Sequence, residues 1–80
     1  MNTLAFQYKP LLIDFEIPDD LKDMINQYLQ YLNKGDRTSD DYYKTEIKLI
    51  LNWCLRESLL TENQIALLRN YYQNDGILGA

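Results

Sequence analysis

The sequence predicts an all-α protein with helices at about residues 19–34, 39–57 and 61–74, preceded by an extended or β-like arm at about residues 4–17. Apolar residues recur at intervals of three and four in three separate segments, which is the period of an amphipathic helix. Each of these segments is also bounded by residues that are typical of helix ends. Together these two observations indicate three helices around one small core.

The arm has the alternation of a β-strand. Along residues 11–17 every second side chain is apolar, as in a strand that buries one face. Because a single strand cannot satisfy its own backbone groups, three arrangements stay open. Residues 4–8 fold back as a partner strand, the arm lies extended over the helices, or it pairs with a second molecule. We expect one domain over residues 1–80, with residues 1–17 as its arm.

The first helix begins after Pro18, with Asp19 and Asp20 in its first turn, where the helix macrodipole favours acidic residues. Gly35 follows it and can adopt the left-handed conformation that often ends a helix. Tyr31 lies off the apolar stripe. The stripe itself consists of Leu21, Met24, Ile25, Tyr28, Leu29 and Leu32.

The second helix begins near Thr38 or Ser39, whose hydroxyls can accept a hydrogen bond from a free amide at the helix start. A second, narrower apolar stripe contains Tyr42, Leu49 and Trp53. A helix that is apolar over so much of its circumference is either central in its domain or bound to another molecule. Its main stripe consists of Tyr43, Ile47, Ile50, Leu51 and Cys54.

The third helix has strong boundary signals. Thr61 and Gln64 have the spacing of a capping box, and Leu60 has the position of a hydrophobic staple. Residues 74–76, Asn-Asp-Gly, end the helix, and Ile77 is expected to pack back against its last turn. The short connection from the second helix predicts a tight helical hairpin. The expected buried face consists of Ile65, Leu68, Tyr71 and Tyr72.

The composition argues against catalysis. The chain has twelve acidic and eight basic residues, a formal net charge of −4, one cysteine and no histidine. Histidine is the commonest general base and metal ligand, and one cysteine can form neither an internal disulfide nor a cysteine zinc site. Cys54 lies on an apolar stripe and is expected to be a core residue. We therefore expect no enzyme activity, no catalytic residues, no metal site and no cofactor.

The charge and the absence of long apolar runs bear on partners and location. An acidic chain is poorly suited to nucleic acid or to anionic membrane surfaces. No apolar run approaches the roughly 20 residues of a membrane span. The unpaired Cys54 and the lack of a signal-peptide pattern are typical of a cytoplasmic protein.

The candidate partner-binding residues are the narrow stripe of the second helix and the acidic cluster that starts the first. Tryptophan and tyrosine on a rigid helix are typical interface anchors, and acidic residues suit a partner with a basic rim. The stripe could instead pack against Phe6, Tyr8 or Phe15 of the arm, and the acids could serve only the helix start. The candidates are Tyr42, Leu49, Trp53, Asp19, Asp20 and Asp23.

These observations favour a small acidic protein-binding module that occludes a partner surface, as an inhibitor, an immunity-type antagonist or a regulatory adaptor. One alternative is a structural protein that dimerises through the arm. The other is a helix-turn-helix DNA-binding regulator whose base-reading residues would be Arg69, Asn70, Gln73 and Asn74. The acid excess argues against the DNA-binding alternative.

Overall fold

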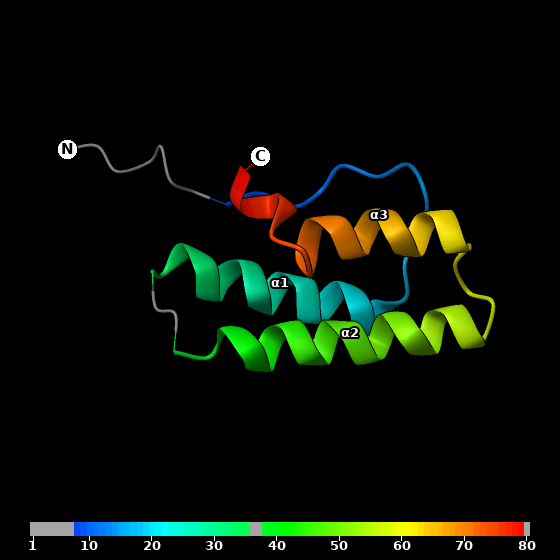
Figure 1. Ribbon diagram of the computed structural model, residues 1–80, viewed down its shortest axis with the longest axis horizontal. Coiled ribbons are helices and arrows are strands. Elements are labelled where there is room, and N and C mark those ends of the chain that lie inside the picture. The colour runs from blue at the N-terminus through cyan, green and yellow to red at the C-terminus, as the bar shows by residue number, and fades with distance from the viewer. Residues whose placement is uncertain (1–7, 36–37, 80) are drawn as a thin grey trace.

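The computed structural model describes residues 8–35 and 38–79, and its helices are drawn in Figure 1. The predicted all-α fold of three helices is confirmed. The helix bounds lie within two residues of those predicted, the largest difference being the third helix, which ends before the Asn-Asp-Gly turn. The elements are α1 (Asp19–Asn33), α2 (Asp40–Arg56), α3 (Glu62–Tyr72) and a short 3₁₀ helix, η2 (Gly76–Gly79).

The helix α2 is the central element of the domain. It packs against both α1 and α3, and η2 packs against α3. Figure 1 shows α1 and α3 on the same side of α2, with the chain that precedes α1 passing along α3 away from α2. One long side of α2 is therefore covered by helices, and the opposite side is not.

The core combines one stripe from each helix. Tyr72 and Tyr28 are the largest side chains in it, and full burial of a large apolar side chain is worth about 1.5–3 kcal/mol. Leu60 and Ile77 lie outside the three helices and are also buried in the core. This agrees with the predicted hydrophobic staple at Leu60 and with the predicted packing of Ile77 against the last turn of α3. The buried residues are Leu21, Ile25, Tyr28, Leu29, Tyr31, Leu32, Ile47, Leu51, Cys54, Leu60, Ile65, Leu68, Tyr72 and Ile77.

The buried position of Tyr31 corrects the expectation that it lies off the core face. Its ring is tilted against Tyr43 at a centroid distance of 4.8 Å and stacks on Tyr28 at 6.1 Å. Its hydroxyl also accepts a hydrogen bond from the Ser39 amide, with 3.2 Å between the two atoms. Aromatic packing across the α1–α2 interface thus widens the buried face of α1 beyond one apolar stripe.

The predicted glycine end of α1 and the predicted capping box of α3 both form as expected. Gly35 has a φ of 81°, the left-handed conformation, directly after α1. Thr61 Oγ1 accepts from the Gln64 amide at 3.1 Å, and Gln64 Oε1 accepts from the Thr61 amide at 2.9 Å, which completes the capping box. The predicted hydroxyl cap of α2 is wrong for Ser39, which occupies the N-cap position but makes no side-chain cap hydrogen bond.

The turn after α3 requires a glycine because the backbone approaches itself closely. A Cβ atom on Gly76 would lie 2.6 Å from the carbonyl oxygen of Asn70. The left-handed residue of this turn is Asp75, with a φ of 63°, and not the glycine. The turn directs Ile77 into the core, where it is 3% exposed.

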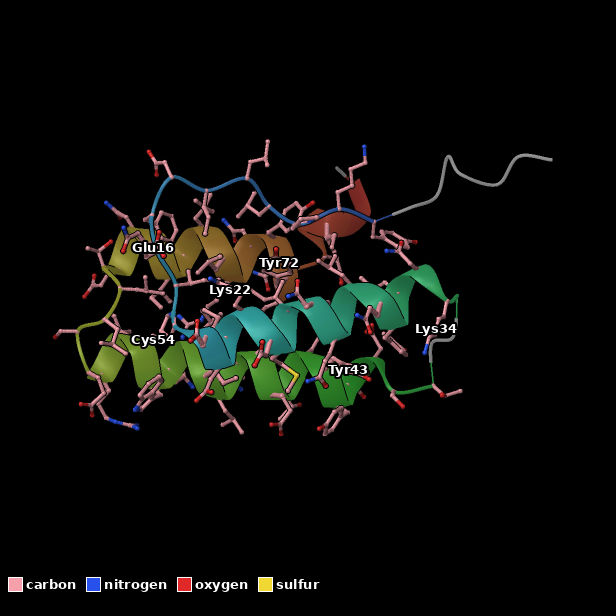
Figure 2. All side chains as sticks on the ribbon, turned by 180° about the vertical axis from the view of Figure 1, so that it is seen from behind. Glu16, Lys22, Lys34, Tyr43, Cys54 and Tyr72 are labelled. Atoms are coloured by element: carbon pink, nitrogen blue, oxygen red, sulfur yellow. The ribbon has the colours of Figure 1, made fainter. Side chains whose placement is uncertain are left out.

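The described part of the arm, residues 8–17, is held by hydrogen bonds to α1 and α3. Asn33 exchanges two hydrogen bonds with the backbone of Tyr8, at 2.6 and 3.2 Å. The Tyr71 hydroxyl donates to the Lys9 carbonyl at 2.7 Å, and the Leu11 amide donates to the Tyr72 hydroxyl at 3.0 Å. Figure 2 shows Tyr72 beneath this segment.

The alternating apolar side chains of the arm pack against helices instead of against another strand. No strand is present among the described residues. Leu11, Phe15 and Ile17 are partly buried against the core, whereas Leu12 is 92% exposed. Residues 4–7 of the expected arm, including Phe6, lie outside the described residues.

Candidate partner-binding surface

The narrow apolar stripe lies on the exposed part of the surface of α2, beside the stripe that this helix buries in the core. Tyr42 and Leu49 are each 55% exposed and Trp53 is 37% exposed. At 100° per residue these positions fall within a sector of about 40°, so they form one line along the helix. We call these three residues the outer stripe of α2.

The described part of the arm does not cover the outer stripe. Tyr8 and Phe15, two of the residues that could have packed on it, instead contact the core cluster. The arm is tied to α3 through Tyr71 and Tyr72. Within the described residues, the outer stripe of α2 therefore remains at the surface.

A shallow pocket lies at the C-terminal half of this stripe. Its volume is about 210 Å³, and its apolar walls are the side chains of Leu49, Ile50 and Trp53. Asp20, from the first turn of α1, and Glu46, one turn before Ile50, complete the lining. We call this the Trp53 pocket: an apolar floor with two carboxylates.

The Trp53 pocket contains only part of the predicted site. Tyr42 is two turns before Leu49 and packs edge-on against Tyr43 at 5.1 Å, so it extends the stripe without lining the pocket. Asp19 and Asp23 are exposed on α1 but do not line the pocket either. Of the three predicted acidic residues, the fold brings only Asp20 to the stripe.

Two residues of the pocket were not among the predicted site residues. Glu46 lies three residues before Leu49 and seven before Trp53, which are spacings that put all three on one helix face. This signal was present in the sequence. Ile50 belongs to the core stripe but is only partly buried, so one side of it also lines the pocket.

The single cysteine is placed as expected. Cys54 is fully buried in the core, and burial raises the pKa of its thiol. A nucleophilic cysteine requires the opposite shift, because the thiolate is the reactive form. Cys54 therefore contributes packing.

Three tyrosines pack together across the α1–α2 interface. Tyr28 stacks on Tyr31 and on Tyr43, Tyr31 is tilted against Tyr43, and the centroid distances are 4.8–6.1 Å. Figure 2 shows Tyr43 at the same end of the molecule as Lys34. The Tyr28 hydroxyl donates to Asp40 Oδ1 at 3.3 Å. Burial, with the Asp40 carboxylate second, raises the pKa of Tyr28 to about 12.

Asp40, at the start of α2, takes part in an ion-pair network. Lys44 pairs with Asp40 at 3.3 Å and with Asp75 at 2.6 Å, and the hydrogen bond to Asp75 is the main cause of its raised pKa. This network connects the start of α2 to the turn after α3. Such exposed pairs contribute modestly, about 0–1 kcal/mol each.

Two other kinds of feature, a metal-ligand cluster and a membrane-spanning helix, do not occur among the described residues. Across residues 8–35 and 38–79, no three histidine, cysteine, aspartate or glutamate side chains gather as a metal site. None of the described helices has the length and apolar character needed to cross a membrane. No protein-family model, curated protein or solved structure matches this chain.

Proposed function

We propose that this protein is a non-enzymatic binding module that occludes a surface of another protein, as an inhibitor, an immunity-type antagonist or a regulatory adaptor. The observation that carries the proposal is the Trp53 pocket, where Leu49 and Trp53 stay exposed beside two carboxylates. A small domain gains stability from every apolar side chain it buries. Leaving tryptophan and leucine together at the surface is typical of an interface.

The charges of the pocket support a partner with a basic rim. Asp20 and Glu46 are its two ionisable lining residues, and both are acidic. An apolar anchor flanked by lysine or arginine would fill the pocket and meet these carboxylates at its rim. Charge complementarity of this kind accelerates association and selects between partners more than it adds affinity.

The alternatives have less support among the described residues. Dimerisation through the arm needs a strand with free edges, whereas residues 8–11 are bound to the chain's own α1 and α3. Light scattering on the purified protein tests this alternative, and a monomer at high micromolar concentration removes it. Duplex DNA binding is tested by a salt-dependent fluorescence titration.

The proposal is tested by capturing partners from the native host with the protein and with matched variants. We expect Trp53→Ala to weaken binding of the captured partner by more than about 2 kcal/mol, or about 30-fold, while the helical circular dichroism is unchanged. Leu49→Ser should act in the same direction. The matched control is Leu67→Ser, a leucine on α3 that is 45% exposed and outside the pocket.

The outcome that contradicts the proposal is equally specific. If Trp53→Ala unfolds the protein, or if Leu49→Ser and Leu67→Ser retain the same partner with equal affinity, the Trp53 pocket is not the binding surface. A second variant, Glu46→Gln, should slow association and weaken its dependence on salt, since a rim charge acts mainly on the association rate.

A further inference from the structure

Another pocket, with a basic lining instead of an acidic one, lies between α2 and the end of α3. It has a volume of about 300 Å³ and is lined by Lys48 of α2, Arg69 of α3, and Gln73 and Asn74 just after α3. We call it the Lys48 pocket. Two of its four lining residues are cationic, the other two carry amide groups, and none is acidic, although the whole chain has a net charge of −4.

The guanidinium of Arg69 is held in place without being neutralised. Its Nη2 donates to Oδ1 of Asn52, on α2, at 2.5 Å. Asn52 is a neutral amide, so the full positive charge of Arg69 stays in the pocket together with its remaining N–H donors. An arginine fixed by a neighbouring side chain loses less conformational freedom when it binds a ligand.

Neither cation of the pocket is paired with an acid in the part of the chain that the structure describes. The ion pairs of that part involve Lys44 with Asp40 and Asp75, and Arg56 with Glu57. Lys44, one turn before Lys48, is the lysine that engages Asp40 and Asp75. Two positive charges therefore line one pocket, an arrangement that an anion would stabilise.

The pocket also contains a residue with a hydrogen-bond donor that has no acceptor among the described residues. Nε2 of Gln73 is buried and has no partner among the described residues. A buried donor that lacks a partner is destabilising, because it has lost its hydrogen bonds to water without gaining another. Because Gln73 lines the pocket, an acceptor oxygen bound there would lie next to a side chain whose amide donor lacks a partner.

We propose that the Lys48 pocket binds a phosphate monoester. Such a group carries a charge of about −1.5 to −2 at pH 7 and three acceptor oxygens. The planar fork of Arg69 fits two of these oxygens, and the Lys48 ammonium reaches a third. A carboxylate, with one charge and two oxygens, would leave one of the two cations unmatched.

The partial negative charge at the end of α3 weakens the attraction of the pocket for an anion but does not cancel it. The C-terminus of a helix acts as about half a negative elementary charge, which disfavours an anion. Lys48 and Arg69 supply two full positive charges at the same place. The volume, at the lower end of the range for ligand pockets of about 300–1,000 Å³, suits a phosphoryl group and a small group esterified to it.

The site is tested by NMR titration of the full chain labelled with ¹⁵N, at constant ionic strength. The probes are inorganic phosphate, ribose 5-phosphate and N-acetyl-phosphoserine amide, each compared with sodium acetate or its dephosphorylated counterpart. We expect saturable shifts of the Gln73 side-chain amide and of Arg69 Nε–H with the phosphorylated probes. The Trp53 indole, which lines the other pocket, should not move.

Substitutions identify the groups that bind. Lys48→Gln, at an exposed position, should weaken phosphate binding at least about tenfold, since each charge-assisted hydrogen bond is worth more than a neutral one. Arg69→Lys keeps the charge but removes the fork and should also weaken it. Lys22→Gln, an equal loss of charge at an exposed position on α1, is the matched control and should leave affinity unchanged.

The arms of the titration also distinguish the source of the phosphate. Tighter binding of ribose 5-phosphate supports a free phosphorylated metabolite, and tighter binding of the phosphoserine amide supports a phosphorylated protein segment. Equal shifts with acetate, or equal weakening by Lys48→Gln and Lys22→Gln, would overturn the proposal. Duplex DNA that binds more tightly than every monoester would also overturn it, in favour of a phosphodiester site.

Discussion

Tyr28 is buried in the core, yet its hydroxyl reaches Asp40 at the surface end of the α1–α2 interface. An acid whose charged form is disfavoured by burial retains its proton to a higher pH. The tyrosine rings therefore serve two purposes at once: they fill the core, and their hydroxyls connect it to polar groups at its margin. Tyr72 does the same at the other face, where its hydroxyl accepts from the arm and burial raises its pKa.

The raised pKa of Tyr28 predicts a loss of stability at alkaline pH. The unfolded side chain ionises near its ordinary value of 10, and the folded one at about 12. Between these values the folded state holds more protons than the unfolded state, so the free energy of unfolding falls as the pH rises from about 10 to about 12. The contribution is fully present below pH 10.

Urea denaturation at a series of pH values measures this effect, with Tyr28→Phe as the reference. We expect the difference in unfolding free energy between the protein and Tyr28→Phe to stay constant below pH 10. It should then shrink as the pH rises further. A difference that does not change up to pH 12 would contradict the assigned cause.

At the scale of the elements, each helix is bounded by a different physical device. α1 ends at a left-handed glycine, α3 begins with a reciprocal capping box, and α2 begins at Ser39 without a side-chain cap. At that uncapped start, the Tyr43 amide bonds to the Ser39 carbonyl and the Ser39 amide to the Tyr31 hydroxyl. A serine at the predicted position is therefore not evidence of a cap by itself.

The two N-caps predict different responses to alanine. Thr61→Ala removes the acceptor for the Gln64 amide and should lower the free energy of unfolding by about 1 kcal/mol. Ser39→Ala should change the free energy of unfolding by no more than a few tenths of the loss in Thr61→Ala, because no cap hydrogen bond is lost. Chemical denaturation measures both, and equal losses for the two variants would contradict the assignment.

At the scale of the whole molecule, the arm joins elements that are far apart in the sequence. Its residues 8–11 are bonded to the end of α1 and to the end of α3. The helical core lies beneath it, and Figure 1 shows that the central helix α2 takes no part in this contact. Among the described residues, none of the arm covers the outer stripe of α2, which is exposed.

Hydrogen exchange tests how the arm is held. Tyr72→Phe removes the acceptor of the Leu11 amide and should speed exchange at that amide about five- to tenfold, because a hydrogen bond contributes about 1 kcal/mol. Tyr71→Phe is the matched control: it removes a donor to the Lys9 carbonyl and leaves the Leu11 bond intact. Equal exchange at Leu11 in both variants would show that the arm is held by other contacts.

The candidate site was predictable in part. Leu49, Trp53 and Asp20 were identified from helical spacing and composition, and Glu46 could have been added from its spacing to Leu49 and Trp53. Spacing alone could not separate Asp20, which lines the pocket, from Asp19 and Asp23, which do not. That distinction depends on how α1 is rotated against α2, which is a property of packing.

The sequence by itself determined the three helices, the apolar stripe of each and most of their ends, because these depend on contacts within a few residues of the chain. Only the tertiary structure decided that the described part of the arm, residues 8–17, lies against α3 rather than on the outer stripe of α2. Only the tertiary structure brought Lys48 together with Arg69, twenty-one residues later. The physical reason is that such contacts depend on the relative placement of whole helices, which is set by the packing of the entire core.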